Sequence, residues 1–337
     1  YLIVFLFIIS FQLFWTITDE DYDFQKISNR KIEISIVQGN SPCPGAKNKC
    51  INERERIYQS HLNLTRGINN KPLILEDGGL RMIVWPESST GFKNDPLISA
   101  ETLDDISNEA ARLDAYFLIG GDRPLDSDYF ENYGVFVNIA GNIEGQYLKQ
   151  HPVPFGEYIP FRKYLEWIPP LALVPRDMNR GEGQKVFNIK GNLNSEKVKI
   201  SPVISFEGSF ERYIRRSVQS GAELIVILTN QASYGKSGMS DQFILMSRAN
   251  AVSNHRDIVH AAITGKSAFI SGFDGEVYSS TDLFEAEIST ELLTGYTVET
   301  PYSRYGNYLN YVSILFGAIL FLYFRVVKRQ PLNSSSL

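Results

Sequence analysis

Two uncharged apolar runs bracket the 337-residue chain and limit how it can fold. The first, "YLIVFLFIISFQLFWTIT" (1–18), would cover about 27 Å as a helix, close to the roughly 30 Å hydrocarbon core of a bilayer. The second, "YLNYVSILFGAILFLYF" (308–324), has tyrosines near its ends, as membrane-interface positions favour. We therefore expect transmembrane helices over 1–18 and 308–326.

A cleaved signal peptide is the alternative interpretation of 1–18. That run has no basic segment before it and no small-residue cleavage site after it. The sequence also does not begin with Met. We therefore expect 1–18 to be the last of several membrane helices of a longer chain.

The charges beside the two runs predict their orientation. Acidic residues follow the first run (19–23), whereas Arg325, Lys328 and Arg329 follow the second. The positive-inside rule predicts a cytoplasmic tail over 327–337 and places the part between the runs outside the cytoplasm. In a Gram-negative bacterium, this arrangement corresponds to an inner (cytoplasmic) membrane protein with a periplasmic domain.

The two cysteines agree with an oxidising compartment. Cys43 and Cys50 lie in "SPCPGAKNKC", where six intervening residues could close a small disulfide. Two free thiols in a loop are the alternative. No further metal-ligating residues cluster beside them, so we expect no metal site there.

The overall charge argues against one class of partner. The chain has 33 basic and 38 acidic residues, a net charge of −5, and no long basic run before its C-terminal end. Because nucleic-acid binding depends on clustered positive charge, we expect no nucleic-acid partner.

Between the apolar runs, strand patterns alternate with helical ones, which is typical of an α/β domain whose sheet faces are covered. A buried strand is expected to end at Pro86, and a hairpin is expected to turn at Gly141. The segment 258–271 reads as one strand. The remaining expected strands are 31–40, 115–122, 199–208, 222–231 and, after a turn at Asp274-Gly275, 276–280, and the expected helices cover 52–68 and 97–113.

Three strand ends carry side chains suited to acyl chemistry. Glu87 follows the strand in "IVWPES", Lys149 lies in the proline-rich "QYLKQHPVPFGEYIPF" with Glu157, and Ser205 ends the strand in "SPVISFEG" two positions before Glu207. A buried carboxylate can act as a base, and an ammonium can stabilise an oxyanion. This set predicts acyl transfer without histidine. Each residue alone could be an ordinary strand-end residue.

The four histidines receive other interpretations. His61 and His255 fall on polar helical patterns, so we expect both to be solvated. His260 lies in an apolar strand and is expected to be a hydrogen-bonded core residue. His151 could orient Lys149 or hydrogen-bond to its own loop. No metal-ligand cluster and no glycine-rich cofactor loop is apparent, so we expect no cofactor.

The motifs taken together resemble the nitrilase superfamily, and within it the outer-facing domain of the apolipoprotein N-acyltransferase family. The most specific segment is "YLKQHPVPFGEYIP" (147–160), supported by "VQGN" (37–40), "VWPES" (84–88), "LTNQASYG" (228–235) and "SRYGNY" (303–308). The resemblance implies a four-layer α-β-β-α sandwich over 31–307, flanked by the two membrane helices.

The resemblance also implies roles for the site residues. Glu87 would be the general base, Lys149 the oxyanion-stabilising cation, and Glu157 and Glu207 supporting carboxylates. Ser205 stands where the family has a nucleophilic cysteine. A hydroxyl is harder to activate than a thiol, so serine would slow the reaction. Ser205 could be an engineered replacement, a natural adaptation or the mark of an inactive homologue.

The implied reaction moves an acyl chain from a phospholipid donor to the N-terminal amine of a diacylglyceryl-cysteine lipoprotein, through an acyl-enzyme. Both partners are lipid-anchored, so a site tethered to the membrane would gain proximity. Two other hypotheses remain open: a non-catalytic homologue that binds lipid or lipoprotein, and a membrane-tethered amidase of the nitrilase type.

Overall fold

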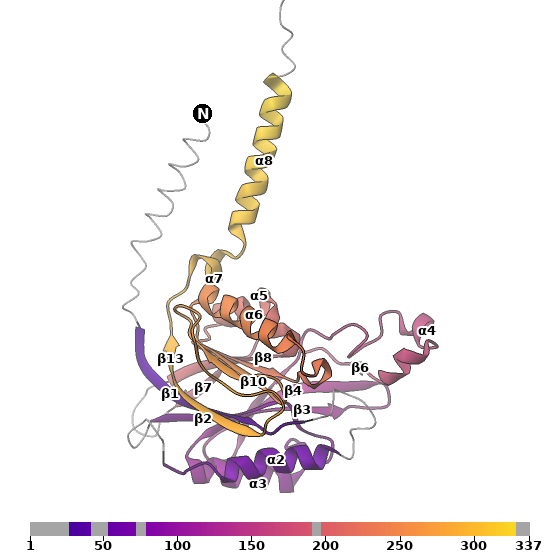
Figure 1. Ribbon diagram of the computed structural model, residues 1–337, viewed down its shortest axis with the longest axis vertical. Coiled ribbons are helices and arrows are strands. Elements are labelled where there is room, and N and C mark those ends of the chain that lie inside the picture. The colour runs from indigo at the N-terminus through magenta and orange to yellow at the C-terminus, as the bar shows by residue number, and fades with distance from the viewer. Residues whose placement is uncertain (1–26, 42–52, 72–78, 191–196, 328–337) are drawn as a thin grey trace, which may run out of the picture.

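The computed structural model describes residues 27–41, 53–71, 79–190 and 197–327, and its strands form two sheets (Figure 1). One sheet has the strand order β13-β1-β2-β3-β4-β5, with β6 paired to β4, and the other has the order β12-β11-β10-β9-β8-β7. The strands of the first sheet are β1 (Ile27–Gln38), β2 (Leu80–Gly91), β3 (Tyr116–Pro124), β4 (Tyr129–Val137), β5 (Ile143–Leu148), β6 (Asp177–Met178) and β13 (Glu287–Tyr296). Those of the second are β7 (Phe187–Lys190), β8 (Lys197–Ile204), β9 (Leu224–Thr229), β10 (Ile258–Ala262), β11 (Ala268–Ile270) and β12 (Val277–Ser280).

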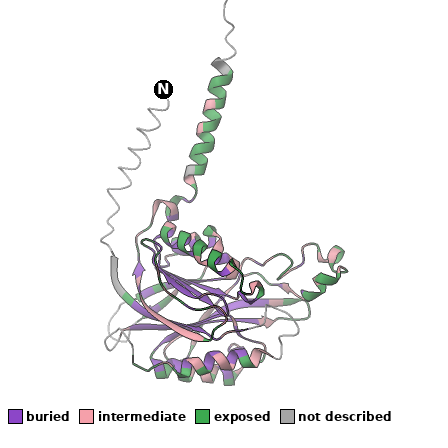
Figure 2. Cartoon of the chain, viewed as in Figure 1, coloured by how far each residue is buried: buried purple, intermediate pink, exposed green. Residues whose placement is uncertain are grey.

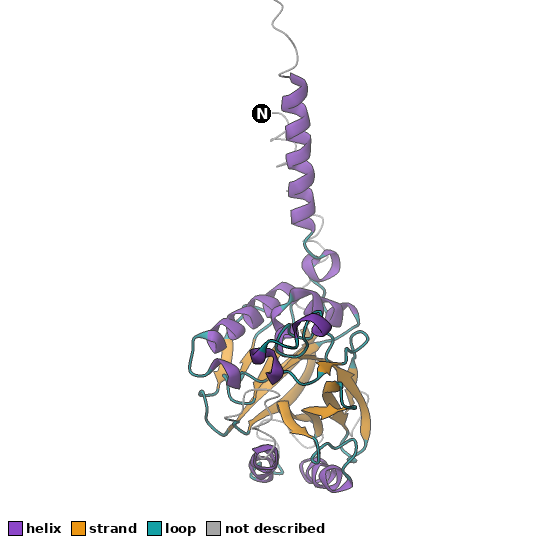
Figure 3. Cartoon of the chain, turned by 90° about the vertical axis from the view of Figure 1, so that its right-hand side faces the viewer, coloured by secondary structure: helices purple, strands orange, loops and turns teal. Residues whose placement is uncertain are grey.

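The two sheets pack face to face, and helices cover their outer faces (Figure 3). The central layer is apolar and includes Val84, Leu118, Phe136 and Leu228, all fully buried. Helices α2 (Arg54–Arg66) and α3 (Ala100–Leu113) cover the first sheet. Helices α5 (Glu211–Gln219) and α6 (Met239–Asn254) cover the second. Buried residues therefore concentrate on the strands and on the inner helix faces (Figure 2), which confirms the predicted α-β-β-α layers.

Parallel pairing at the centre of each sheet brings strand ends together. Strands β1, β2 and β3 run parallel, as do β8, β9 and β10. The carboxyl ends of neighbouring parallel strands lie at one edge of a sheet, where ligand sites in α/β folds commonly form. The ends of β8 and β9 in the second sheet lie beside the irregular part of β2 in the first sheet, around one cavity.

The strand predictions were wrong at two places. Strand β2 does not end at Pro86: pairing with β3 stops after Trp85 and resumes at Thr90, leaving a bulge between them. Proline cannot donate a backbone hydrogen bond, so the ladder opens there without ending the strand. The segment 258–271 is a hairpin of β10 and β11, not one strand. The structure also adds β7 and β13 as edge strands that the sequence pattern did not reveal.

Two of the histidine predictions were also wrong, because His61 and His255 are buried. The Nδ1 atom of His61 lies 2.7 Å from the carbonyl oxygen of Ile57, and its Nε2 atom accepts a hydrogen bond from the Gly39 amide. Burial lowers the pKa of His61 to about 4, so this ring is neutral and structural. His260 is a hydrogen-bonded core residue, as predicted, with contacts to Gln231 and Ser247.

The C-terminal part leaves the sandwich through the short helix α7 (Pro301–Tyr305) and the 20-residue helix α8 (Tyr308–Val327), which projects away from both sheets (Figure 1). Apolar α8 side chains are exposed along its length, including Ile314 and Leu315. Among the described residues, none of the helices combines the length and apolar character needed to cross a membrane. The run 1–18, the tail from 328 onward, and both Cys43 and Cys50 lie outside the described residues.

The β2 bulge makes a testable demand on Gly120 in β3. A Cβ atom at Gly120 would lie 2.4 Å from the carbonyl oxygen of Pro86 and 2.8 Å from Cα of Glu87. We expect Gly120→Ala to lower the free energy of unfolding by about 1–3 kcal/mol, because backbone atoms must move. Denaturant unfolding measures this change.

Gly238→Ala is the matched control. Gly238 has a φ of −68°, and a Cβ there would meet no atom within 4 Å. Its unfolding free energy should change by no more than about 0.5 kcal/mol. Equal effects of the two substitutions would contradict the close approach of β3 to the bulge.

Candidate active site

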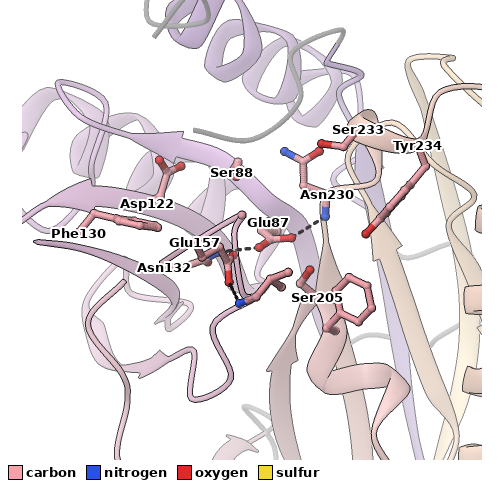
Figure 4. A pocket seen from close by; sticks show the side chains of 13 residues that line it. Glu87, Ser88, Asp122, Phe130, Asn132, Glu157, Ser205, Asn230, Ser233 and Tyr234 are labelled. Atoms are coloured by element: carbon pink, nitrogen blue, oxygen red, sulfur yellow. Dashed lines mark hydrogen bonds between the residues drawn. The ribbon is translucent and has the colours of Figure 1, made fainter. Parts of the chain in front are cut away.

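A cavity of about 260 Å³ opens beside the irregular part of β2 and the ends of β8 and β9 (Figure 4). Its walls combine carboxylates, amides, hydroxyls and aromatic rings. Three of the five predicted site residues line it: Glu87, Glu157 and Ser205. The other lining residues are Ser88, Asp122, Phe130, Asn132, Val153, Gly156, Phe206, Asn230, Ser233 and Tyr234.

Glu87 lies in the β2 bulge, and its carboxylate is held from two sides. Its Oε1 atom accepts hydrogen bonds from Asn132 Nδ2 at 2.6 Å and from Lys149 Nζ at 3.3 Å. Its Oε2 atom accepts one from the backbone amide of Asn230 at 2.6 Å. A carboxylate offers about four acceptor positions, so one remains for a further donor. Burial raises the pKa of Glu87, although Lys149 opposes this shift, and a raised pKa makes the carboxylate a better base.

Lys149 follows β5 and is fully buried beneath the cavity. Its ammonium group bonds to Glu157 Oε1 at 2.5 Å and to Glu87 Oε1 at 3.3 Å. Burial alone would lower the pKa of Lys149, but the charges of Glu157 and Glu87 outweigh burial and raise it. Lys149 therefore stays protonated. An ammonium has three donors, and one has no partner among the described residues.

Glu157 is fixed by its own loop. Its Oε2 atom accepts a hydrogen bond from the backbone amide of Val153 at 2.9 Å, while its Oε1 atom faces Lys149. The prolines at 152 and 154 restrict the loop around this contact. The carboxylate thus orients the ammonium toward Glu87.

Ser205 directly follows β8 and begins the 3₁₀ turn Ser205–Ser209. Its φ is +56°, in the left-handed region that non-glycine residues seldom adopt. Such a turn lifts the side chain off the strand end, as nucleophile positions in α/β enzymes require. The Ser205 hydroxyl points toward the Glu87 carboxylate (Figure 4) and has no hydrogen-bond partner in the described part of the chain. The structure therefore brings Glu87, Lys149 and Ser205 together.

Glu207 is fully buried and lies outside the cavity lining. Its Oε1 atom accepts from the backbone amides of Gln150 and His151, at 2.5 and 3.0 Å. Its Oε2 atom accepts from the Tyr147 hydroxyl at 2.7 Å and from the Ile204 amide at 2.8 Å. Burial raises the pKa of Glu207, and the hydrogen bonds from Ile204, Tyr147 and Gln150, with the charge of Lys149, oppose the shift. Glu207 therefore connects the turn Ser205–Ser209 (the serine turn) to residues 149–151 (the lysine segment), and it positions both.

Sequence reasoning assigned no role to Asn132 or Tyr234. Asn132 lies in the middle of β4, where no strand-end signal marks it, yet its amide holds Glu87. Tyr234 follows β9 in the quoted motif "LTNQASYG" and packs 5.7 Å from Phe243, centroid to centroid. No group of three or more His, Cys, Asp or Glu side chains in the described ranges is arranged to hold a metal ion.

An α-β-β-α sandwich with a carboxylate, an ammonium and a strained strand-end nucleophile position defines a class of acyl-transferring and amide-hydrolysing enzymes. The family model for carbon-nitrogen hydrolase matches residues 33–302. The chain belongs to the carbon-nitrogen hydrolase family.

Curated relatives carry a more specific name. The chain is 27% identical over 296 residues to the apolipoprotein N-acyltransferase of Mycolicibacterium smegmatis, covering 86% of this chain and 48% of that protein. It is 31% identical over 281 residues to the same-named protein of Rickettsia bellii, covering 81% and 51%. The chain thus spans about half the length of these curated relatives.

Solved structures agree on the fold alone. The Nit3 protein of Saccharomyces cerevisiae, a member of the nitrilase superfamily, superposes with a TM-score of 0.54 at 17% identity, covering 80% of this chain and 92% of that chain. A carbon-nitrogen hydrolase from Helicobacter pylori gives a TM-score of 0.54 at 14% identity, covering 78% and 89%.

The four-donor arrangement around Glu207 predicts a large stability effect. In Glu207→Gln, one acceptor oxygen would be replaced by an NH2 group, which cannot accept a hydrogen bond. One or two of the four donors around Glu207 would then lose their charged acceptor. We expect the free energy of unfolding to fall by about 2–4 kcal/mol. Chemical denaturation with circular dichroism measures it.

Glu182→Gln is the control for this charge change. Glu182 is exposed and has no partner in the described part of the chain, so its substitution should alter stability by about 0.5 kcal/mol or less. If Glu207→Gln were equally mild, the proposed linkage between the serine turn and the lysine segment would be wrong.

Proposed function

We propose that this chain transfers an acyl group from a phospholipid to the N-terminal amine of a diacylglyceryl-cysteine lipoprotein, through an acyl-Ser205 intermediate. The observation that carries the proposal is the cavity in which Ser205 faces Glu87, with Lys149 bonded to the same carboxylate. The name shared by the curated relatives supports this substrate pair.

In the first half-reaction, the Ser205 oxygen attacks the carbonyl carbon of the donor ester while Glu87 accepts the hydroxyl proton. The carbonyl oxygen becomes an oxyanion, which the third N–H of Lys149 stabilises. The intermediate then collapses, the bond to the lysophospholipid oxygen breaks, and that oxygen takes the proton from Glu87. Acyl-Ser205 remains.

In the second half-reaction, the acceptor amine attacks the acyl carbon and loses a proton to Glu87. Collapse forms the amide and breaks the bond to the Ser205 oxygen, which recovers the proton. An oxygen ester reacts less readily with amines than a thioester does, and a hydroxyl is a weaker nucleophile than a thiol. Both halves are therefore slower with serine than with cysteine at this position.

The proposed reaction takes place at a bilayer, and the exposed apolar side chains of helix α8 support that location. These side chains, Ile314 and Leu315 among them, have no protein surface to cover them within the described chain. Lipid would bury that area favourably. The proposed location is the bacterial inner membrane, with the sandwich on the periplasmic side and the apolar side chains of α8 in contact with lipid.

Labelling of single cysteines tests the membrane placement. Ile314→Cys, in α8, should react with a water-soluble maleimide only after detergent is added to the membranes. Glu101→Cys, in the exposed first turn of α3, should react from the periplasmic side without detergent. The unsubstituted chain gives the background. Rapid labelling of Ile314→Cys in intact membranes would exclude a lipid-embedded α8.

Mass spectrometry of Ser205 tests the activity. After incubation of the full chain with phosphatidylethanolamine, the peptide containing Ser205 should gain the mass of one acyl group, and Ser205→Ala should gain none. Ser205→Cys should acylate faster by about tenfold or more, a change of about 1.4 kcal/mol in the barrier.

The other two hypotheses predict different results. An adduct on Ser205→Cys alone would identify a homologue that has lost its nucleophile. Turnover of small amides without any lipid-derived adduct would identify an amidase. Absence of an adduct in both forms, with folding intact, would refute the acyltransferase.

A further inference from the structure

Arg212, in the first turn of α5, carries a positive charge that no carboxylate neutralises within the described chain. Its guanidinium carbon lies 4.5 Å from the ring centroid of Phe210 and 5.0 Å from that of Tyr213. These rings hold the guanidinium in place while leaving its N–H donors for another partner. The neighbouring Glu211 is engaged elsewhere, because it accepts a hydrogen bond from Asn307.

His151 joins this arginine to the catalytic segment. Its Nδ1 atom lies 3.5 Å from Arg212 Nη2, and its ring packs 4.8 Å from Phe210, centroid to centroid. His151 lies two residues after Lys149, and its backbone amide donates a hydrogen bond to Glu207. Burial, then the positive charges of Arg212, Lys149 and Arg180, lower the pKa of His151. The imidazole is therefore neutral, and the positive charges around it would favour the binding of an anion there.

Arg180 adds a second guanidinium beside the same segment, and its charge acts on His151 together with that of Arg212. The amide of Gly181 donates to the carbonyl oxygen of Lys149 at 2.9 Å, so the backbone at 180–181 lies against the lysine segment. Arg180 stacks 5.6 Å from the Tyr158 ring centroid. It is exposed and, like Arg212, forms no ion pair among the described residues.

Arg212 lies on the helix that contacts the base of α8. Asn307, immediately before α8, bonds to Glu211 at the start of α5, and Gln219 at the end of α5 donates to the Ser303 carbonyl oxygen in α7. Figure 1 shows α5 and α7 together beneath α8. If α8 enters the bilayer, Arg212 lies at the depth of the lipid headgroups, where phosphates are abundant.

We propose that Arg212, Arg180 and His151 form a binding site for the phosphodiester of the acyl donor's headgroup, an inference that rests on the proposed function. Guanidinium groups bind phosphate oxygens in bidentate fashion. Because this site borders the lysine segment beneath the cavity, a phosphate held there keeps the glycerol ester of the same molecule near Ser205.

A binding experiment on the full chain in detergent tests the site without requiring catalysis. The probe is dihexanoylphosphatidylethanolamine below its micellar concentration, and dihexanoylglycerol, which lacks the phosphate, is the comparison ligand. We expect Arg212→Gln to weaken phospholipid binding about tenfold, and Arg180→Gln with Arg212→Gln to remove the preference for phospholipid over diacylglycerol. Arg212→Lys should retain part of the affinity.

Arg56→Gln is the control for loss of one positive charge. Arg56 lies in α2 on the opposite layer and makes only an exposed pair with Glu53 at 2.9 Å. It should bind the phospholipid like the unsubstituted chain. Equal binding by Arg212→Gln, or equal affinity of the unsubstituted chain for diacylglycerol, would overturn the proposal. Inorganic phosphate binding as tightly as the phospholipid would assign the site to free phosphate and also overturn it.

The acyl adduct on Ser205 separates this inference from the proposed function. Loss of phospholipid binding in Arg212→Gln, without any adduct on the unsubstituted chain, would support the headgroup site and refute the acyl transfer. Adduct formation with unchanged binding in Arg212→Gln would do the reverse.

Discussion

The buried ammonium of Lys149 between Glu87 and Glu157 is the contact on which the site depends. An uncompensated charge in a protein interior is very costly, so Lys149 can be buried only beside carboxylates. Burial, together with the negative charge of Glu157, raises the pKa of Glu87, while the Lys149 ammonium opposes this shift. A carboxylate with a raised pKa binds a proton more readily, so the buried site that makes the charges costly also makes Glu87 suited to act as a base.

The proposed acyl transfer would leave the charge balance of this site unchanged. When the Ser205 proton moved to Glu87, the negative charge would move from the carboxylate to the oxyanion, and Lys149 would stabilise both. The cavity therefore contains one ammonium, one charged Glu157 and one further negative charge before and during the attack. A site organised in this way needs little rearrangement at the moment of reaction, which is the basis of electrostatic catalysis.

The sequence predicted the parts of this site that follow from strand ends. Glu87 and Ser205 were each marked by an apolar run that gives way to polar residues, and in each of the two sheets the central strands run parallel, so their carboxyl ends gather on one side of that sheet. The proline-rich loop likewise marked Lys149 and Glu157. Asn132 was missed because a polar residue inside β4 resembles any solvent-facing strand position. Its importance depends on a long-range contact to Glu87, 45 residues away, which no local pattern contains.

Burial was the property that local patterns predicted least well. His61 was expected to be solvated because its helix is polar overall, yet it lies on the same stripe as Ile57, Tyr58 and Leu62, which are all buried. The i, i+3 and i+4 spacing of His61 from those residues indicates that it lies on the buried face of the helix. The edge strand β13 was missed for a related reason: its residues are mostly half-buried, so no strong apolar alternation marks it.

In the described part of the chain, the backbone conformation of the serine turn is held by contacts of neighbouring residues, not by a hydrogen bond of the Ser205 hydroxyl. The left-handed φ at Ser205 is an unfavourable conformation that surrounding contacts must stabilise. The Glu207 carboxylate supplies them, since it bonds both the Ile204 amide before the turn and the amides after Lys149. From this turn the chain passes within seven residues to Arg212 and, through Glu211, to Asn307 at the base of α8. Ser205 and the base of α8 are thus linked by a short covalent path and a few hydrogen bonds, so in the proposed membrane location any surface that orients α8 would also orient the cavity.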